Sequence, residues 1–305
     1  NNRNTAHEFE KYLLEVKPEV VHSFALYISC SPILRVMSKY PKIKWIYSSW
    51  GSDLFYFKNI PEYLSDIKKV LPRINYLFTD CNRDYKIAQE LGFSGQFLGV
   101  FPGGGGYKLK EYENYLNPLE ERKIILIKGF QGRSGRAIQV LKAVLLLKKE
   151  LESYNVIVFG ADKEVIDFSN QTKFTNWNNF KIVPRIAHLE VMQFMGKSLI
   201  YIGNSNSDGM PNTLLEAIIM GAFPIQSNPE SVTEEIIEED SNGLLIYNHE
   251  DELEIKAKIE KVLNNKGMLL KSFNINMKLR HQLDYDYIRE QVLGKYTLIE
   301  NSISN

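Results

Sequence analysis

Residues 199–227 read Leu-Ile-Tyr-Ile-Gly-Asn-Ser-Asn-Ser-Asp-Gly-Met-Pro-Asn-Thr-Leu-Leu-Glu-Ala-Ile-Ile-Met-Gly-Ala-Phe-Pro-Ile-Gln-Ser, and they predict a strand, a loop, a helix and a second strand. The short apolar run over 199–202 suits a buried strand, and the small polar residues of 203–209 suit a loop. Pro211 suits the first position of the helix, where its missing N–H costs nothing. Strands that alternate with helices indicate a parallel sheet covered by helices.

The loop before this helix is a candidate anion site. The first N–H groups of a helix, here those of Asn212, Thr213 and Leu214, carry partial positive charge and commonly bind phosphate. Two acidic residues flank the site, because Asp208 lies in the loop and Glu216 lies on the helix. We expect Glu216 to point at the bound group, since it shares a helix face with Asn212 and Thr213. The alternative is that both acids are solvated and the unit is only scaffold.

The stretch Asp-Gly-Met-Pro-Asn-Thr-Leu-Leu-Glu-Ala-Ile-Ile-Met-Gly-Ala-Phe-Pro-Ile, which begins at Asp208, resembles the signature of glycosyltransferase family 4. Members of that family are retaining, nucleotide-sugar-dependent transferases of the GT-B fold. Their pattern has two Glu residues eight positions apart, and this chain departs from it at the first, where Asp208 replaces Glu. Residues 235–237 and 242–246 are similar to the family's continuation. The resemblance covers about residues 18 to 250.

Four consecutive glycines at 103–106 mark a linker, because glycine runs are costly inside a helix or strand. With the alternating elements on both sides, the resemblance implies a GT-B fold: two Rossmann-like α/β domains with parallel sheets that face a cleft. We expect an acceptor-side domain over 1–102 and a nucleotide-sugar domain over 107–284. We expect a closing helix over 285–305 to return to the N-terminal domain. Because the family's N-terminal domain is longer, we also expect residues 1–102 to be an incomplete copy.

The resemblance assigns roles in the donor site. It implies that Glu216 binds ribose hydroxyls, and that Asp208 binds the donor sugar together with the backbone of Gly209 and Met210. The amides of Thr213 and Leu214, beside Asn212, would bind the diphosphate. An Asp at position 208 reaches one methylene less far than Glu, so we expect a different choice of donor sugar or a lower activity.

The loop that follows an apolar run at 124–128 is a second candidate phosphate site. It reads Lys128-Gly129-Phe130-Gln131-Gly132-Arg133-Ser134-Gly135-Arg136, and a Gly-rich loop with cations can cradle a diphosphate. Such cations would neutralise the charge that develops on the leaving nucleoside diphosphate. We rank Lys128 and Arg133 first, with Gly129 and Arg136 as further donor contacts. Arg185 is expected at the nucleobase. The alternative for each cation is ordinary surface charge.

The acceptor side is expected near Trp50-Gly51-Ser52-Asp53. Many relatives have His-Gly-Thr-Asp here, so Trp50 replaces a histidine and cannot transfer protons. We expect Asp53 to contact the acceptor or donor sugar, and the alternative is that it caps the next helix. His22, which follows an apolar pair, is expected to face the same region with Trp50 and Ser52, and its alternative is a scaffold role.

Composition excludes several function classes. The 305 residues include 37 basic and 37 acidic ones, so charge gives no argument for nucleic acid. No apolar run is long enough to span a membrane and no signal peptide is visible, which predicts a cytoplasmic protein. Cys30 and Cys81 are unpatterned, so we expect reduced thiols with no ligand cluster and no metal. A set of basic residues could form a face of the N-terminal domain that binds anionic lipid, and the alternative is an ordinary solvated face. These residues are Lys39, Lys42, Lys44, Lys68, Lys69 and Arg73.

These observations favour a metal-independent retaining glycosyltransferase. It would transfer a sugar from a nucleotide-sugar donor, a co-substrate and not a cofactor, to a saccharide or lipid-linked acceptor in bacterial surface polysaccharide or glycoconjugate synthesis. One alternative is a catalytically degenerate GT-B protein that binds nucleotide sugar or acts as a partner subunit. A sugar-nucleotide epimerase is the weaker alternative, since it would not share the arrangement of Asp208 and Glu216. The expected catalytic residues are Asp208, Glu216, Lys128, Arg133 and Asp53.

Overall fold

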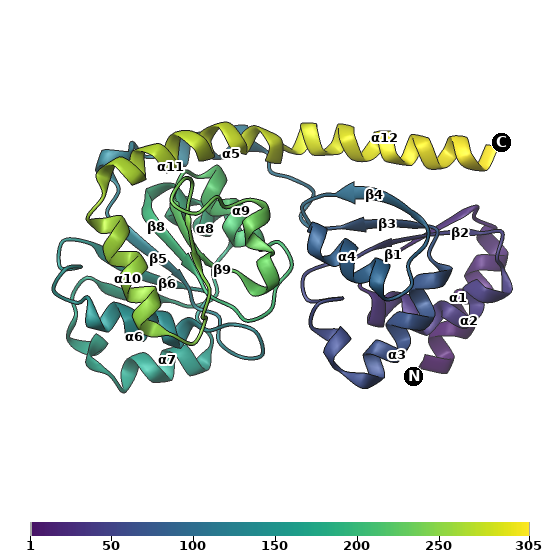
Figure 1. Ribbon diagram of the computed structural model, residues 1–305, viewed down its shortest axis with the longest axis horizontal. Helices are drawn as coiled ribbons and strands as arrows, with labels where there is room; N and C mark the ends of the chain where they lie inside the picture. Colours follow the sequence, from purple (N-terminus) through teal and green to yellow (C-terminus); the bar gives the residue numbers. More distant parts are fainter. Residues whose placement is uncertain (1, 305) are drawn as a thin grey trace. The chain divides into compact units, whose positions relative to one another are not determined.

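Every strand pair in residues 2–304, the part of the chain that the computed structural model describes, is parallel. The strands form two sheets, one in each of two units (Figure 1). The first unit comprises Asn1–Gly105, Asp208–Met210 and Ile288–Asn305, and the second comprises Gly106–Ser207 and Pro211–Tyr287. Parallel strands joined by helices are the arrangement that the alternating sequence pattern predicts.

The sheet of the first unit has four strands in the order β1-β2-β3-β4. Its centre is fully buried, with Trp45, Tyr47 and Leu77 at 0% exposure. This is expected for a sheet covered on both faces. The strands are β1 (Val20–Phe24), β2 (Lys44–Ser48), β3 (Tyr76–Thr79) and β4 (Gln96–Val100), and the helices are α1 (Asn2–Val16), α2 (Leu34–Lys39), α3 (Pro61–Val70) and α4 (Asn82–Glu90).

The sheet of the second unit has six strands in the order β10-β9-β8-β5-β6-β7. Strand β5 pairs with β6 on one side and with β8 on the other, so the strand order reverses at β5. Ligands bind at such a switch point, beyond the carboxyl ends of the strands. The strands are β5 (Ile124–Lys128), β6 (Asn155–Phe159), β7 (Phe180–Val183), β8 (Ser198–Gly203), β9 (Phe223–Ser227) and β10 (Leu244–Ile246).

Seven α-helices belong to the second unit within the described residues, and α10 packs on α6. Helices α8 and α9 pack against each other, which places the start of α8 near α9. The helices are α5 (Leu109–Tyr112), α6 (Ala137–Leu146), α7 (Lys163–Asn170), α8 (His188–Lys197), α9 (Asn212–Ile219), α10 (Glu252–Leu263) and α11 (Lys266–Leu279).

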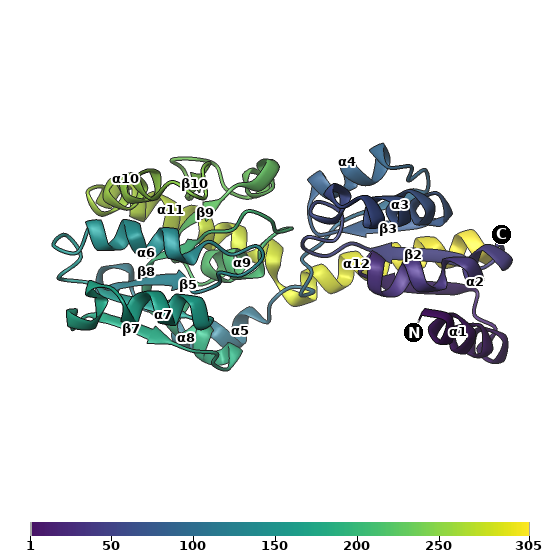
Figure 2. The same cartoon turned by 90° about the horizontal axis from the view of Figure 1, so that it is seen from below.

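The last helix, α12 (Tyr285–Ser304), lies beside the sheet of the first unit from Ile288 onward (Figure 2). Ile299 is 2% exposed and packs in one apolar cluster with Ile46, Tyr76, Phe78 and Leu98. The hydroxyls of Tyr76 and Ser302 are 2.6 Å apart. The helix therefore covers one face of this sheet. The two units divide at Gly105 and Tyr287, and Asp208–Met210 belongs to the first unit although its neighbours in the chain belong to the second.

Several predicted element boundaries were wrong. Helix α9 begins at Asn212, so Pro211 precedes the helix with extended backbone angles instead of opening it. Helix α6 ends at Leu146, five residues earlier than expected, and turns follow it. Helices α7 and α11 were missed, although each begins at a side-chain cap, Asp162 and Asn265 respectively. No helix among residues 2–304 is long and apolar enough to cross a lipid bilayer.

Candidate functional site

Glu216 lies on α9 at the switch point, and its carboxylate contacts α8. The residue as a whole is 6% exposed, and its Oε1 lies 2.9 Å from Nε2 of His188, the first residue of α8. The hydrogen bond to Glu216 raises the pKa of His188, against a smaller opposing effect of burial. The sequence predicts that Glu216 points at the bound group, and the structure adds a histidine 28 positions earlier that contacts one of its oxygens. His188 carries no motif, so sequence reasoning missed its role.

The amino end of α9 provides two backbone donors and not three. Leu214 N donates to Pro211 O at 3.0 Å, which corrects the expectation that its N–H is available. The N–H groups of Asn212 and Thr213 have no acceptor in the described part of the chain, as expected for a first helical turn. The turn is held by two tyrosines, because Tyr107 donates to Asn212 O at 3.1 Å and Tyr201 donates to Thr213 Oγ1 at 2.8 Å.

The Gly-rich loop between β5 and α6 is closed upon itself. A Cβ at Gly129 would lie 2.6 Å from Ala161 Cα, and one at Gly135 would lie 2.2 Å from Phe130 O. Both positions therefore require glycine. Ala137 N donates to Phe130 O and Ile138 N donates to Gln131 Oε1, each at 3.0 Å. Two of the first backbone donors of α6 are thus already used within the loop.

The loops that follow β5 and β8 are joined by backbone hydrogen bonds. Arg136 N donates to Asn204 O and Asn206 N donates to Ser134 O, each at 2.9 Å. Gly135 and Ser205 form an antiparallel bridge between the same loops. The two candidate phosphate loops are therefore neighbours at the switch point of the second unit, as the strand order requires.

The cations of this region differ in their engagement. The guanidinium of Arg136 pairs with the Glu250 carboxylate, so a donor phosphate would compete with this partner. The Lys128 ammonium lies 5.6 Å from the centre of the Phe130 ring. Arg133 and Arg185 are exposed. Lys128, Arg133 and Arg185 therefore remain candidates for a nucleotide.

In the first unit, Asp53 is a buried structural carboxylate. It is 1% exposed, both its oxygens accept from Leu26 N at 3.0 and 2.8 Å, and it also accepts from the Tyr47 hydroxyl. Desolvation raises its pKa to about 6. The carboxylate thus caps the short π-helical turn over Leu26–Cys30, which replaces the loop that we expected there. It does not cap the next helix, and its position gives no support to the expected sugar contact.

The segment Asp208–Met210 contacts the turn between β3 and α4. Arg83 Nη2 donates to Asp208 O at 2.7 Å. A Cβ on Gly209 would lie 2.3 Å from Asp80 Oδ2, so the backbone of Gly209 approaches the Asp80 carboxylate as only a glycine can. The same Asp80 oxygen accepts from Gly51 N at 2.8 Å. Asp80 and Arg83 were not among the residues selected from sequence, because nothing in the local pattern relates them to position 208.

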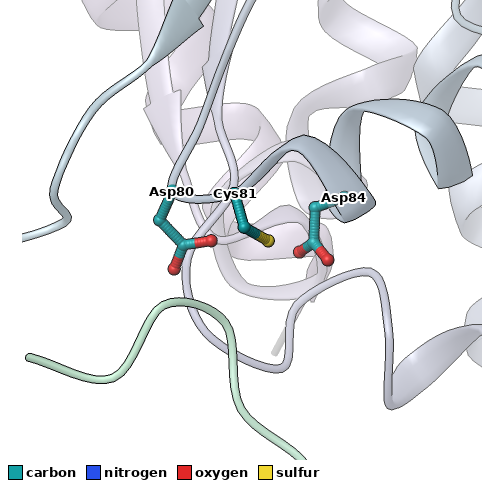
Figure 3. A group of neighbouring side chains, drawn as sticks. All are labelled: Asp80, Cys81 and Asp84. Atoms are coloured by element: carbon teal, nitrogen blue, oxygen red, sulfur yellow. The ribbon is translucent and has the colours of Figure 1, made fainter. Parts of the chain in front are cut away.

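Asp80, Cys81 and Asp84 form a cluster at this turn, with one potential ligand atom from each within 4.8 Å of the others (Figure 3). This corrects the expectation that Cys81 has no ligand cluster nearby. Arg83 donates to Asp84 Oδ1 from Nε at 3.0 Å and from Nη2 at 2.8 Å, so a guanidinium already balances that charge. Burial raises the pKa of the Cys81 thiol far above its usual range. Since metal binding requires a thiolate, the residues fit a metal ion poorly.

An aromatic pocket of about 180 Å³ lies at the carboxyl end of the first sheet. Its ring walls include Phe24 and Trp50, whose centroids are 5.0 Å apart, and its lining contains no carboxylate, lysine or arginine. His22 lies within β1 and joins Ser48 Oγ at 2.9 Å to the Tyr296 hydroxyl at 2.7 Å. Desolvation lowers the pKa of His22 to about 4, so the pocket is uncharged at neutral pH. The pocket brings together His22 and Trp50, whereas Ser52 is not among its lining residues.

A family model described as glycosyl transferases group 1 matches residues 110–284. The chain belongs to this family. The match contains the switch point, the β5–α6 loop and the whole of α9 with Glu216. The family and the GT-B fold predicted from the 208–225 signature are thereby confirmed. The matched range begins after the glycine linker and ends just before α12.

Individual relatives are distant. An α-1,4-N-acetyl-D-galactosaminyltransferase of Campylobacter jejuni, named for a saccharide on diphosphoundecaprenol, is 21% identical over 185 residues. These residues are 60% of this chain and 50% of the relative, so the chain spans about half the length of this curated enzyme. At this identity the relative supports the family and does not define a substrate.

Solved structures share the fold over nearly the whole chain. HepE of Anabaena in complex with UDP has a TM-score of 0.75 at 11% identity, over 96% of this chain and 81% of that one. Sucrose-phosphate synthase from Thermosynechococcus elongatus has a TM-score of 0.74 at 14% identity, over 98% of this chain and 78% of that one. The pneumococcal O-GlcNAc transferase GtfA with UDP and GlcNAc has a TM-score of 0.72 at 15% identity, over 97% of this chain and 60% of that one.

Proposed function

We propose that this chain is a retaining glycosyltransferase that transfers a sugar from a nucleotide-sugar donor to an acceptor hydroxyl. The setting we propose is bacterial surface polysaccharide or glycoconjugate synthesis in the cytoplasm, with a saccharide or lipid-linked acceptor. The Campylobacter relative, which is named for a lipid-linked saccharide, and the neighbours solved with UDP support this choice. No cofactor takes part, because the nucleotide sugar is itself a substrate.

The observation that carries the proposal is the position of Glu216 on α9, behind a helix start with two available amides at the sheet's switch point. The Glu216 carboxylate accepts hydrogen bonds from the ribose hydroxyls. The N–H groups of Asn212 and Thr213 bind the diphosphate, with the partial positive charge of the helix end behind them. Arg185 stacks on the base, and Asp208 with the Gly209 and Met210 backbone binds the donor sugar.

Cationic side chains take the place of a metal in this scheme. As the bond from the sugar to the diphosphate breaks, negative charge grows on the leaving phosphate oxygens. Lys128 and Arg133, on the loop beside the β8 loop, stabilise that charge more in the transition state than in the bound donor. The acceptor binds the first unit at the aromatic pocket that contains His22 and Trp50. Its hydroxyl attacks the anomeric carbon with retention of configuration, and its proton passes to the leaving diphosphate oxygen.

The experiment that tests the donor site is a thermal-shift screen with UDP, GDP, ADP, dTDP and CMP. A ligand at one hundred times its dissociation constant adds about 2.7 kcal/mol to the free energy of unfolding. We expect one nucleotide to raise the Tm, and the rise to disappear in Glu216→Ala and to shrink in Glu216→Gln. Glu235→Gln, a change of another glutamate in the same unit, should leave the rise intact. If none of the nucleotides raises the Tm, the donor assignment is wrong.

The second candidate function is binding of nucleotide sugar without turnover, and two observations favour it. Trp50 stands where relatives have histidine, and Asp208 replaces the first glutamate of the signature. Release of free nucleoside diphosphate without acceptor does not separate the two functions, because slow hydrolysis gives the same product. Appearance of the sugar on a lipid-linked saccharide establishes transfer. Nucleotide binding with no transfer to any acceptor favours the second candidate.

A further inference from the structure

The ring of His188 is the one side-chain partner of the Glu216 carboxylate among the described residues, with Nε2 and Oε1 2.9 Å apart. We propose that His188 is a positioning residue for the nucleotide site, which fixes Glu216 for the ribose and makes nucleotide affinity depend on pH. This inference rests on the proposed donor site and assigns its regulation. It uses a residue that no sequence motif selects.

The geometry gives Glu216 two separate tasks. A carboxylate has two oxygens and about four acceptor positions, and His188 uses Oε1. The other oxygen can then accept from the ribose. The side chain of Glu216 is 8% exposed, so its conformation is set by protein contacts and little by solvent. An ordered acceptor loses less conformational entropy when a ligand binds, which increases affinity.

His188 can titrate while it holds this contact. Its side chain is 55% exposed, so protons exchange readily with solvent, and its neutral form with a proton on Nε2 keeps the hydrogen bond. The protonated ring makes a stronger, charge-assisted bond, which holds the Glu216 carboxylate more firmly for the ribose. Affinity therefore rises as pH falls through the pKa of His188, which Glu216 raises above the ordinary value.

The neighbouring elements add few competing charges. Helix α8 packs against α9, β5, β8 and the 3-10 turn Glu113–Tyr115. Besides His188 and Glu216, the titratable groups of these elements, of α5 and of the residue Tyr107 before it are Tyr107, Lys110, Glu111, Tyr112, Glu113, Tyr115, Lys128, Glu190, Lys197 and Tyr201. Glu190 Oε2 accepts from Ala187 N at 3.2 Å. Burial raises the pKa of both Tyr107 and Tyr112, and the Glu216 charge adds a smaller effect in the same direction. Only Glu216 contributes a charge to the pKa shift of His188.

The experiment compares His188→Gln and His188→Ala with the unchanged protein by calorimetric titration of UDP and of pyrophosphate, between pH 5.5 and 8.5. The probe is whichever nucleotide raises the Tm in the screen, with UDP as the first choice. The glutamine amide can donate one hydrogen bond but cannot titrate, and alanine can do neither. Because pyrophosphate has no ribose, its affinity reports the phosphate contacts alone. His281→Gln, a change of an exposed histidine in the same unit, is the matched control.

We expect His188→Ala to weaken UDP binding about three- to tenfold and pyrophosphate binding much less, as the loss of one hydrogen bond predicts. We expect His188→Gln to match the unchanged protein at pH 8.5 and to lack its gain in affinity at lower pH. Phosphate groups titrate near pH 6 themselves, so the comparison is made between variants at each pH. Equal UDP affinity of all variants at every pH overturns the proposal, as does an equal loss for pyrophosphate.

An NMR titration of His188 without nucleotide separates this inference from the donor-site proposal. We expect Glu216→Gln to lower the pKa of His188 relative to the unchanged protein. If the pKa does not move, the pair does not form in solution and the inference fails whatever binds. If the pKa moves but neither UDP nor another nucleotide binds, the donor-site proposal fails. The role of His188 in nucleotide affinity then fails with it.

Discussion

The Tyr296 hydroxyl on α12 lies 2.7 Å from Nδ1 of His22 on β1, across 274 positions of the chain. The other ring nitrogen of His22 lies 2.9 Å from Ser48 Oγ on β2. One imidazole therefore connects the last helix to two strands of the first unit. Because desolvation lowers its pKa to about 4, this connection is made by the neutral ring.

The first prediction concerns the pH dependence of this connection. Between about pH 6.5 and pH 4 the unfolded chain binds a proton at His22 and the folded chain does not, so His22 makes stability fall as pH falls. We expect His22→Gln to flatten the Tm profile over this range. Asp53 and Asp80, whose pKa values are raised, change stability in the opposite sense, so the readout is the difference between variant and parent. A difference that is constant from pH 4 to 7 would show that His22 does not titrate with folding.

Tyr296→Phe provides the control for that measurement. It removes the hydroxyl that contacts His22 and keeps the ring, so it should lower stability by about 1 kcal/mol at neutral pH. The pH profile should keep its shape, since His22 remains. A loss much larger than this would mean that the ring packing, and not the hydrogen bond, is altered.

The second prediction tests the carboxylate at the 208–210 contact. Burial raises the pKa of Asp80 to about 7, and its Oδ1 has no hydrogen-bond partner in the described residues. Because the folded protein holds the Asp80 proton more tightly than the unfolded chain, this carboxyl favours the fold at low pH. The contribution is lost as pH rises from about 4 to about 7. We expect Asp80→Asn to be more stable than the parent at pH 8, by up to about 4 kcal/mol, with no such gain at pH 4.

Divalent cations give the contrasting outcome for the same turn. If Asp80, Cys81 and Asp84 bound Mg²⁺ or Mn²⁺, millimolar metal would raise the Tm of the parent and not of Asp80→Asn. We expect neither protein to respond, because Arg83 already pairs with Asp84 and the thiol is protonated. A metal-dependent rise in the parent alone would contradict this view and the expected metal independence.

The third prediction concerns the closed loop between β5 and α6. A Cβ at Gly135 would meet backbone at 2.2 Å, and backbone cannot move aside as a flexible side chain can. We expect Gly135→Ala to lower the free energy of unfolding by about 3 kcal/mol and to abolish nucleotide-induced stabilisation. Gly294→Ala is the matched control, because nothing lies within 4 Å of a Cβ at that helical position. It should raise stability by up to about 1 kcal/mol in urea unfolding.

The sequence predicted elements whose signals are local. Apolar runs next to turn residues predict strands over 76–79, 96–100, 124–128 and 244–246, and these are the bounds of β3, β4, β5 and β10. Each of the missed helices α7 and α11 begins at an Asx cap, which is a weak signal by itself. The signature on α9 was recognisable for the same reason, because its residues are consecutive.

Contacts between distant segments could not be predicted in the same way. His188 meets Glu216, and Arg83 meets Asp208, only because sheet order and helix packing bring their elements together. No periodicity encodes such pairs. For the same reason, the sequence does not show that the side chains of Asp53 and Arg136 have structural partners. The sequence shows which residue types are present, and the structure shows which of their side chains already have partners within the protein.

The last prediction concerns Trp50, which is 46% exposed at the aromatic pocket and tilted against Phe24. An exposed ring next to uncharged walls offers a face for a sugar ring, whose C–H groups suit the negative face of the indole. We expect Trp50→Ala to raise the KM for a lipid-linked saccharide acceptor about three- to tenfold, with the donor KM unchanged. Trp50→Phe should recover most of the loss, because it restores an aromatic face.

Tyr12→Ala is the control for Trp50, since it removes an aromatic ring that is 61% exposed elsewhere in the first unit. It should change neither KM. Stability should be little affected by either alanine variant, because both side chains are largely on the surface. A rise in the donor KM alone would move Trp50 from the acceptor to the donor. Unchanged kinetics in Trp50→Ala would exclude the pocket wall from substrate binding and leave the acceptor to another face of the first unit.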